Sequence, residues 1–223
     1  MTFIIAELSG NHGGDLGKAK ELIRAAAECG CDAAKIQAYL PEDLDAENAA
    51  LYQKLHIPKD WYGELFSTAD MAKIDLFASV FAPWAVEFLE PFKPIAYKIA
   101  SPESTRLDRD TYLDLAMYIH RTEADLFVST GLADMDFMRR LEPQVLFYCK
   151  AGYPATVDDG DVKLVRDMAC GFSDHSAGIE WTKKMIQAGA THIEKHFKLD
   201  DDCIDAAFSL NPDQMKQLCQ LAY

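Results

Sequence analysis

Two histidines at the ends of neighbouring predicted strands are the clearest sign of chemistry in this sequence. His175 follows a predicted strand that begins at residue 171, and His196 lies near the end of another over residues 191–197. A helix is expected between them, and a strand–helix–strand unit makes its two strands parallel, so both imidazoles emerge at the same carboxyl edge. One divalent metal ion could bind there, beside the carboxylates of Asp174 and Glu194. A single histidine is more often a satisfied core or loop residue, and the paired placement favours the metal hypothesis.

Polar side chains at the other predicted strand ends indicate a small anion as ligand. Lys35 and Lys98 lie inside strands between apolar residues, where an unpaired ammonium group is costly. An isolated lysine near a strand end is usually solvated, but two of them with several hydroxyls predict a phosphate or carboxylate pocket. The polar residues at these ends are Glu7, Asn11, His12, Lys35, Gln37, Ser79, Lys98, Ser101, Ser129, Thr130, Cys149, Lys150, Ser173, Asp174, His175, Glu194 and His196.

Strands and helices alternate along the whole chain. The other strands are expected at residues 3–5, 32–38, 76–81, 95–100, 125–129 and 145–149, with helices between them and a last helix at 212–221. Eight strands, each followed by a helix, predict an α/β fold of the (β/α)8 TIM barrel type. A doubly wound open sheet needs the same alternation, but the sequence has no glycine-rich dinucleotide fingerprint. Residues 39–59 have no clear structure of their own, which is typical of a lid or binding loop.

Composition limits the class of protein. With 223 residues and 49% hydrophobic content, the chain is most simply one domain, residues 1–223. A formal net charge of −14 argues against nucleic acid or an anionic membrane surface as partner. Six cysteines without CxxC spacing suit free thiols in a reducing cytoplasm. The N-terminal apolar run is too short for a signal peptide or a membrane span, so we expect a cytoplasmic protein.

A series of short motifs resembles the sialic acid synthase family over almost the whole chain. In order they are IAELSGNHGG, YKIAS, STG, YP, GFSDHSAGI, GATHIEKHF and SLNPD. The resemblance implies a TIM-barrel transferase that condenses phosphoenolpyruvate (PEP) with an open-chain N-acetylhexosamine-type aldose, N-acetylmannosamine or a relative. The products would be a nonulosonic (sialic-type) acid and phosphate. It also implies a homodimer and a divalent metal ion, Mn²⁺ in the first place, with Mg²⁺ or Co²⁺ as substitutes.

The resemblance assigns roles to individual residues. Catalytic roles fall on Glu7, Lys35, Lys98 and Asp205, and metal ligands on His175 and His196. Substrate contacts fall on Asn11, Gln37, Ser101, Ser129, Tyr153 and Ser173. Asp205 and Tyr153 come from the resemblance alone, because no pattern in their own loops singles them out.

Departures from the family pattern concern the sugar half of the site. The sequence at hand ends at Tyr223, so we expect the family's C-terminal antifreeze-like domain, whose arginine contacts the N-acylated sugar, to be missing. Ala151 stands where many members have asparagine, and Lys150 is the nearest cation without an assigned role. We therefore expect weak use of N-acetylmannosamine. Two other functions remain open, namely a Schiff-base aldolase that uses Lys35 or Lys98, and a non-catalytic barrel that binds a sugar acid or phosphate.

Overall fold

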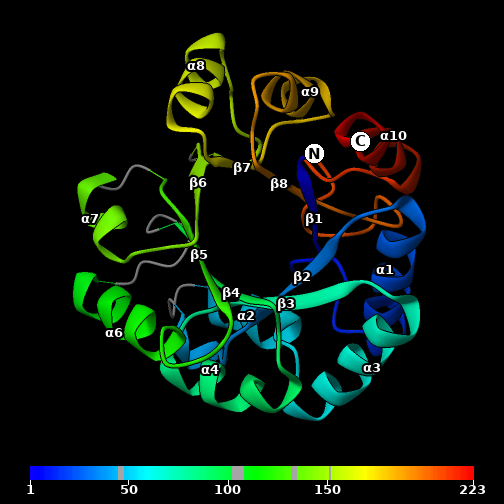
Figure 1. Ribbon diagram of the computed structural model, residues 1–223. Coiled ribbons are helices and arrows are strands. Elements are labelled where there is room, and N and C mark those ends of the chain that lie inside the picture. The colour runs from blue at the N-terminus through cyan, green and yellow to red at the C-terminus, as the bar shows by residue number, and fades with distance from the viewer. Residues whose placement is uncertain (45–47, 102–107, 132–134, 151) are drawn as a thin grey trace.

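The structure, a computed structural model, describes residues 1–44, 48–101, 108–131, 135–150 and 152–223. Within these residues the strands form one closed parallel barrel in which each strand pairs with its neighbours in chain order and β8 pairs with β1 (Figure 1). The predicted TIM barrel is confirmed. The strands are β1 (Phe3–Glu7), β2 (Ala33–Ala38), β3 (Asp75–Val80), β4 (Ala96–Ile99), β5 (Asp125–Ser129), β6 (Val145–Cys149), β7 (Gly171–Asp174) and β8 (His192–His196).

Helices surround the barrel and bury their apolar faces against it (Figure 1). They are α1 (Leu16–Cys29), α2 (Ala49–Leu55), α3 (Tyr62–Ala72), α4 (Pro83–Leu89), α6 (Arg109–Ile119), α7 (Met135–Arg140), α8 (Asp159–Met168), α9 (Glu180–Gln187) and α10 (Pro212–Ala222). Local signals set their ends. Asp15 caps the start of α1 by accepting from the Lys18 amide, and Gly30 ends it in a left-handed conformation at φ 88°.

The segment 39–59 differs from the expectation of an unstructured loop. It contains the short 3₁₀ helix η1 (Pro41–Asp43) and the two-turn helix α2. A further 3₁₀ helix, η3 (Lys59–Trp61), leads into α3. Asp43 anchors the segment, because its Oδ2 accepts from the Leu40 amide at 2.7 Å and from the Trp84 indole at 2.9 Å. These hydrogen bonds leave no periodic pattern of apolar residues in the sequence. The short helices of this segment were therefore not predicted.

The inside of the barrel is layered. An apolar cluster fills its lower part with Ile5, Ala33, Phe77, Ala96, Phe127 and Phe147. Two residues further along each strand the same face becomes polar, since side chains of one face alternate with those of the other. The strand register then sets Glu7 level with Lys35 and His196, and Glu194 level with Ser173. The apolar layer thus supports a polar layer at the carboxyl ends of the strands.

Candidate active site

A cavity of about 370 Å³ opens at the carboxyl ends of the strands, above the apolar layer. Eleven of the twelve site residues predicted from the sequence line it: Glu7, Lys35, Gln37, Lys98, Ser101, Ser129, Tyr153, Ser173, His175, His196 and Asp205. These eleven residues come from seven strands or the turns after them and from the loop after β8, and Ser79 at the end of β3 adds the eighth strand. Also in the lining are Ser9, Tyr39, Leu44, Tyr52, Ser79, Phe81, Ala100, Cys149 and Glu194.

A buried network of two lysines and two glutamates forms the base of this cavity. The Lys35 ammonium lies 2.7 Å from Glu7 Oε2 and 3.3 Å from Glu194 Oε2. Lys35 also donates to the Ser79 hydroxyl at 2.7 Å. The Lys98 ammonium lies 2.7 Å from Glu194 Oε1 and 4.3 Å from the centre of the Phe147 ring. The lysines are thus not unpaired as the sequence suggested, because Glu7 and Glu194 each supply a carboxylate.

Burial and the neighbouring charges act against each other on the pKa values of Lys35, Lys98 and Glu194. Burial alone would lower the pKa of Lys35, but the carboxylates of Glu194 and Glu7 outweigh it and raise that pKa above its ordinary value. Burial lowers the pKa of Lys98, with the positive charge of Lys35 acting in the same direction. Burial would raise the pKa of Glu194, yet the two lysines and Ser173 hold it well below its ordinary range. Glu194 is therefore held as an anion between the side chains of Lys35 and Lys98.

His175 and His196 face each other at the side of the cavity, with ring centres 5.4 Å apart. Nδ1 of His196 lies 2.9 Å from Asp205 Oδ2, and Nδ1 of His175 lies 3.7 Å from the Cys149 sulfur. These contacts leave the Nε2 atoms as the ring nitrogens available to a ligand. Burial, with His196 nearby, lowers the pKa of His175 to about 3, so this imidazole is neutral as a metal ligand must be.

The pair fits a divalent ion that keeps most of its ligands as water. In the described part of the chain no group of three or more His, Cys, Asp or Glu residues is placed to hold a metal. Two imidazoles are a donor set that such ions use, and a carboxylate hydrogen-bonded to one of the rings gives it outer support. Asp174, expected beside the histidines, instead points out of the barrel, because it alternates with Ser173 on β7.

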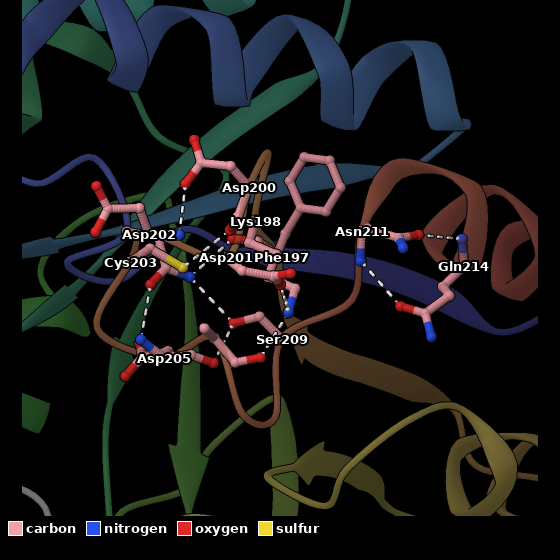
Figure 2. A network of polar contacts seen from close by, with 12 residues as sticks. Phe197, Lys198, Asp200, Asp201, Asp202, Cys203, Asp205, Ser209, Asn211 and Gln214 are labelled. Carbon is pink, nitrogen blue, oxygen red and sulfur yellow. Dashed lines mark hydrogen bonds and ion pairs between the residues drawn. The ribbon is translucent and has the colours of Figure 1, made fainter.

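The loop between β8 and α10 carries Asp205 and is tied together by polar contacts (Figure 2). Lys198 donates to Asp201 Oδ1 and to the Ala206 carbonyl, both at 2.7 Å, and the Ser209 hydroxyl donates to the Asp205 carbonyl at 2.8 Å. These bonds fix the backbone on both sides of Asp205. Its carboxylate is thereby held next to His196.

Asn11 has a different place from the one expected. It is buried and outside the cavity lining, and its amide donates to the Phe197 carbonyl at 2.9 Å and to Ser209 at 3.1 Å. Its Oδ1 accepts from the Asp205 amide at 3.1 Å. Asn11 thus joins the loop after β1 to the loop that presents Asp205, and holds that loop rather than a substrate.

Lys150 also lies away from the position that the sequence suggested. Its ammonium pairs with Asp161 at 2.8 Å and with Asp158 at 3.3 Å, at the start of α8. This cation without an assigned role does not line the cavity. The neighbouring position 151, where Ala151 replaces the usual asparagine, lies outside the described residues.

The segment that holds η1 and α2 gives the cavity an aromatic wall. Tyr39 makes edge-to-face contacts with Tyr52 at 6.0 Å and with Phe81 at 5.6 Å, and Leu44 completes the wall. None of these four was singled out from the sequence. The long segment was recognised as a possible lid, and its tyrosines were the available signal.

A second buried ion pair lies behind the histidines, between the barrel and α9. The side chains of Lys195 and Asp174 are both fully buried, with Nζ 3.1 Å from Oδ2. Asp174 also accepts from the Ser176 amide at 2.7 Å and from the Thr182 hydroxyl. The pair therefore fixes the turn that carries His175.

We expect Lys195→Met to lower the free energy of unfolding by about 3–5 kcal/mol, because it leaves the Asp174 carboxylate buried without its cation. Urea unfolding followed by circular dichroism measures this. Lys184→Met is the matched control, since Lys184 pairs with Asp159 on the surface, where such pairs contribute about 0–1 kcal/mol. Equal effects of the two substitutions would refute the role given to Lys195.

His12 lies under the lid segment and is buried, with 2% of its surface exposed. Its Nδ1 accepts from the Gly14 amide at 3.1 Å, and its ring packs edge-on against Trp61. Burial lowers its pKa from 6.5 to about 4. The folded state therefore holds His12 neutral at a pH where the unfolded chain already binds a proton.

This lowered pKa predicts a pH-dependent loss of stability. The contribution of His12 is complete above pH 6.5 and is lost as the pH falls toward 4, because only the unfolded state gains the proton in that window. His12→Asn keeps an acceptor for Gly14 and removes the titration. Between pH 7 and pH 5 the variant should lose about 2 kcal/mol less stability than the parent. Urea midpoints at several pH values test this, and parallel curves would contradict it.

A closed parallel barrel with a charged cavity at its carboxyl ends defines an enzyme of the TIM-barrel class. The NeuB family model matches residues 22–222. Pseudaminic acid synthase of Campylobacter jejuni (strain 81-176) is 35% identical over 250 residues, which cover 97% of this chain and 71% of that protein. N,N'-diacetyllegionaminic acid synthase of Legionella pneumophila is 31% identical over 257 residues, covering 98% of this chain and 70% of the relative.

A solved structure agrees with these relatives. The N-acetylneuraminic acid (sialic acid) synthetase of Leptospira borgpetersenii, in complex with citrate, superposes with a TM-score of 0.85 at 26% identity. The match covers 99% of this chain and 82% of that one. The chain therefore belongs to the NeuB family, and the predicted enzyme class, a transferase of the sialic acid synthase type, is confirmed. Among the described helices, none combines the length and apolarity that crossing a membrane would need.

Proposed function

We propose that this protein condenses PEP with an open-chain N-acylated amino-sugar aldose to give a nonulosonic acid and phosphate. The observation that carries the proposal is that one cavity holds the Lys35–Lys98 base and, at its side, the facing imidazoles of His175 and His196. The first part suits the carboxylate and phosphate of PEP. The second suits the carbonyl group that PEP must attack.

PEP would bind at the base of the cavity through charge-assisted hydrogen bonds. Lys35 and Lys98 face its anionic groups, and the hydroxyls at the ends of β4, β5 and β7 (Ser101, Ser129 and Ser173) add donors without adding charge. Glu7 and Glu194 already balance the two lysines, so a bound PEP makes the cavity negative. That excess favours a cation at the histidines.

His175 and His196 would hold a divalent ion, Mn²⁺ in our proposal, which when bound polarises the aldehyde oxygen of the sugar. Asp205 keeps the His196 ring in place through Nδ1. Carbon 3 of PEP then forms the new bond to the aldehyde carbon, water adds to carbon 2, and phosphate leaves with its bridging oxygen. In this proposal Glu7 accepts the proton of that water; its Oε2 lies 2.7 Å from the Lys35 ammonium, at the base of the cavity.

The acceptor is proposed to be an aldose of the pseudaminic or legionaminic type, with N-acetylmannosamine used weakly. The relatives in which identity exceeds 30% carry those names, and the wall of Tyr39, Leu44, Tyr52 and Phe81 offers apolar contact to acyl and methyl groups. A homodimer in the cytoplasm remains our prediction. The test is phosphate release from PEP across a panel of acylated and plain aldoses, with and without Mn²⁺.

A lysine aldolase is the second candidate, since burial lowers the pKa of Lys98 as a nucleophilic amine requires. One experiment distinguishes the two functions. If the protein were an aldolase, borohydride with substrate would attach the sugar acid covalently to Lys98, and the reaction would not need PEP. The proposed synthase forms no such adduct and consumes PEP.

We expect Lys98→Ala to weaken PEP binding at least about tenfold, because a charge-assisted hydrogen bond contributes roughly 1.5–3 kcal/mol. Calorimetry with PEP alone measures this without any acceptor sugar. Lys163→Ala on the exposed face of α8 serves as the control and should bind PEP like the parent. Unchanged affinity in Lys98→Ala would exclude this base as the PEP site.

A further inference from the structure

Three of the six cysteines gather where the first and last helices of the barrel meet. Cys29 ends α1, Cys31 lies just before β2, and Cys219 lies inside α10. The sulfur atoms of Cys31 and Cys219 are 3.7 Å apart, and both side chains are buried. All three thiols are free. None of them lines the cavity, so the proposed reaction leaves them unexplained.

The surroundings bring the two sulfurs of Cys31 and Cys219 together and orient them. A Cβ on Gly30 would lie 3.7 Å from the Cys219 Cβ, so α10 passes directly over the turn that carries Cys31. Cys29 is occupied differently, because its thiol donates to the Pro212 carbonyl at 3.3 Å. Of the three, Cys31 and Cys219 are therefore the pair in sulfur–sulfur contact.

The contact between α1 and α10, called the seam below, lies where β8 pairs with β1 and closes the barrel. α10 packs on α1, and the two helices lie side by side near the chain ends (Figure 1). The Thr2 amide donates to the Ala222 carbonyl at 3.4 Å, and the Tyr223 hydroxyl donates to Asp32, next to Cys31. A covalent bond across the seam would join the first βα unit to the last.

We propose that Cys31 and Cys219 are a redox-active dithiol that a peroxide converts into a disulfide, which locks α10 onto the barrel. Hydrogen peroxide is the oxidant because it is small enough for buried thiols. The sulfur atoms need to approach by about 1.7 Å to reach the bond length of a disulfide, a distance that rotation of two side chains can share.

The step balances with peroxide as the two-electron acceptor. The Cys219 thiolate attacks one peroxide oxygen to give a sulfenic acid, and the first water forms from the other oxygen. The Cys31 sulfur then attacks the Cys219 sulfur, and the hydroxyl leaves as the second water. The contact between the thiols lowers the pKa of Cys219 and raises that of Cys31, which makes Cys219 the first to react.

The experiment treats the whole chain with hydrogen peroxide under native conditions, blocks remaining thiols by alkylation and maps peptides without reduction. The expected result is a cross-linked pair of peptides joining Cys31 to Cys219, which dithiothreitol removes. Because the bond would close most of the chain into one loop, the oxidised protein should also melt roughly 5–10 °C higher than the reduced one.

Cys29→Ser is the matched control, since Cys29 adjoins the pair and should leave the cross-link intact. Cys31→Ser should abolish both the cross-link and the rise in melting temperature, and Cys31→Ala replaces it if the serine variant misfolds. The proposal is overturned if the parent shows no Cys31–Cys219 peptide while an unfolded sample of the same chain is oxidised. A main cross-link through Cys29 would overturn it as well.

Discussion

The double variant His175→Ala/His196→Ala is expected to bind no stoichiometric Mn²⁺ and to release phosphate from PEP at least about 100-fold more slowly than the parent. Loss of an outer support of a metal ligand alone costs about 10–100-fold, and here both ligands are removed. Because the site has only two protein ligands, a single remaining imidazole would bind the ion too weakly. Even His175→Ala alone should therefore abolish stoichiometric binding. Metal analysis after desalting and titration with Mn²⁺ measure binding directly.

His120→Ala is the control for this experiment, because His120 lies at the end of α6 and contacts the Leu141 carbonyl rather than the cavity. It should bind metal as the parent does. Circular dichroism of the double variant guards against unfolding. If the folded double variant binds Mn²⁺ like the parent, the histidine pair is not the metal site.

Lys35→Met should have the largest effect on the base of the cavity. It leaves the Glu7 carboxylate, 1% exposed, without its cation, and leaves Glu194, 3% exposed, with Lys98 as its remaining cation. We expect the free energy of unfolding to fall by about 3–5 kcal/mol. PEP affinity should fall at least about tenfold in the same variant, since a charged donor is lost. Urea unfolding and calorimetry measure the two effects separately.

A second substitution separates charge balance from ligand binding. Glu7→Gln removes the charge that Lys35→Met leaves unpaired, and the glutamine oxygen can still accept from the Ser9 amide. The double variant should therefore recover part of the stability, while PEP affinity stays low. Additive losses of stability in the two variants would show that Glu7 and Lys35 do not act as a pair.

The sequence predicted the barrel because its signals are local and repeated. Most strands are apolar runs followed by a polar end, and some helices end at a residue suited to it, such as Gly30 after α1. Alternation along β8 also follows from the sequence: Glu194 and His196 lie two residues apart and line the cavity, while Lys195 between them points to the other face. Periodicity was sufficient for these features.

Contacts between distant residues were beyond such patterns. Lys35 and Lys98 were expected to need an anionic ligand. Glu7 already faces Lys35 from the adjacent strand β1, and Glu194 faces Lys98 from β8, on the other side of the barrel from β4. Pairing of this kind depends on side-chain reach across the barrel. The structural role of Asn11 was not predicted for a related reason. The loop that it holds begins at Phe197, 186 residues away in sequence. The aromatic wall formed by Tyr39, Leu44, Tyr52 and Phe81 was not predicted, because these residues follow no helical or strand periodicity in the sequence.

The most direct test of the central claim is to follow PEP, an N-acylated amino-sugar aldose and Mn²⁺ by mass spectrometry and phosphate assay together. The account predicts one phosphate and one keto-sugar acid, containing all carbons of both substrates, for each PEP consumed. Lys98→Ala and the double histidine variant should both lose this product. Phosphate release without a carbon–carbon coupled product, or as much product from either variant as from the parent, would contradict it.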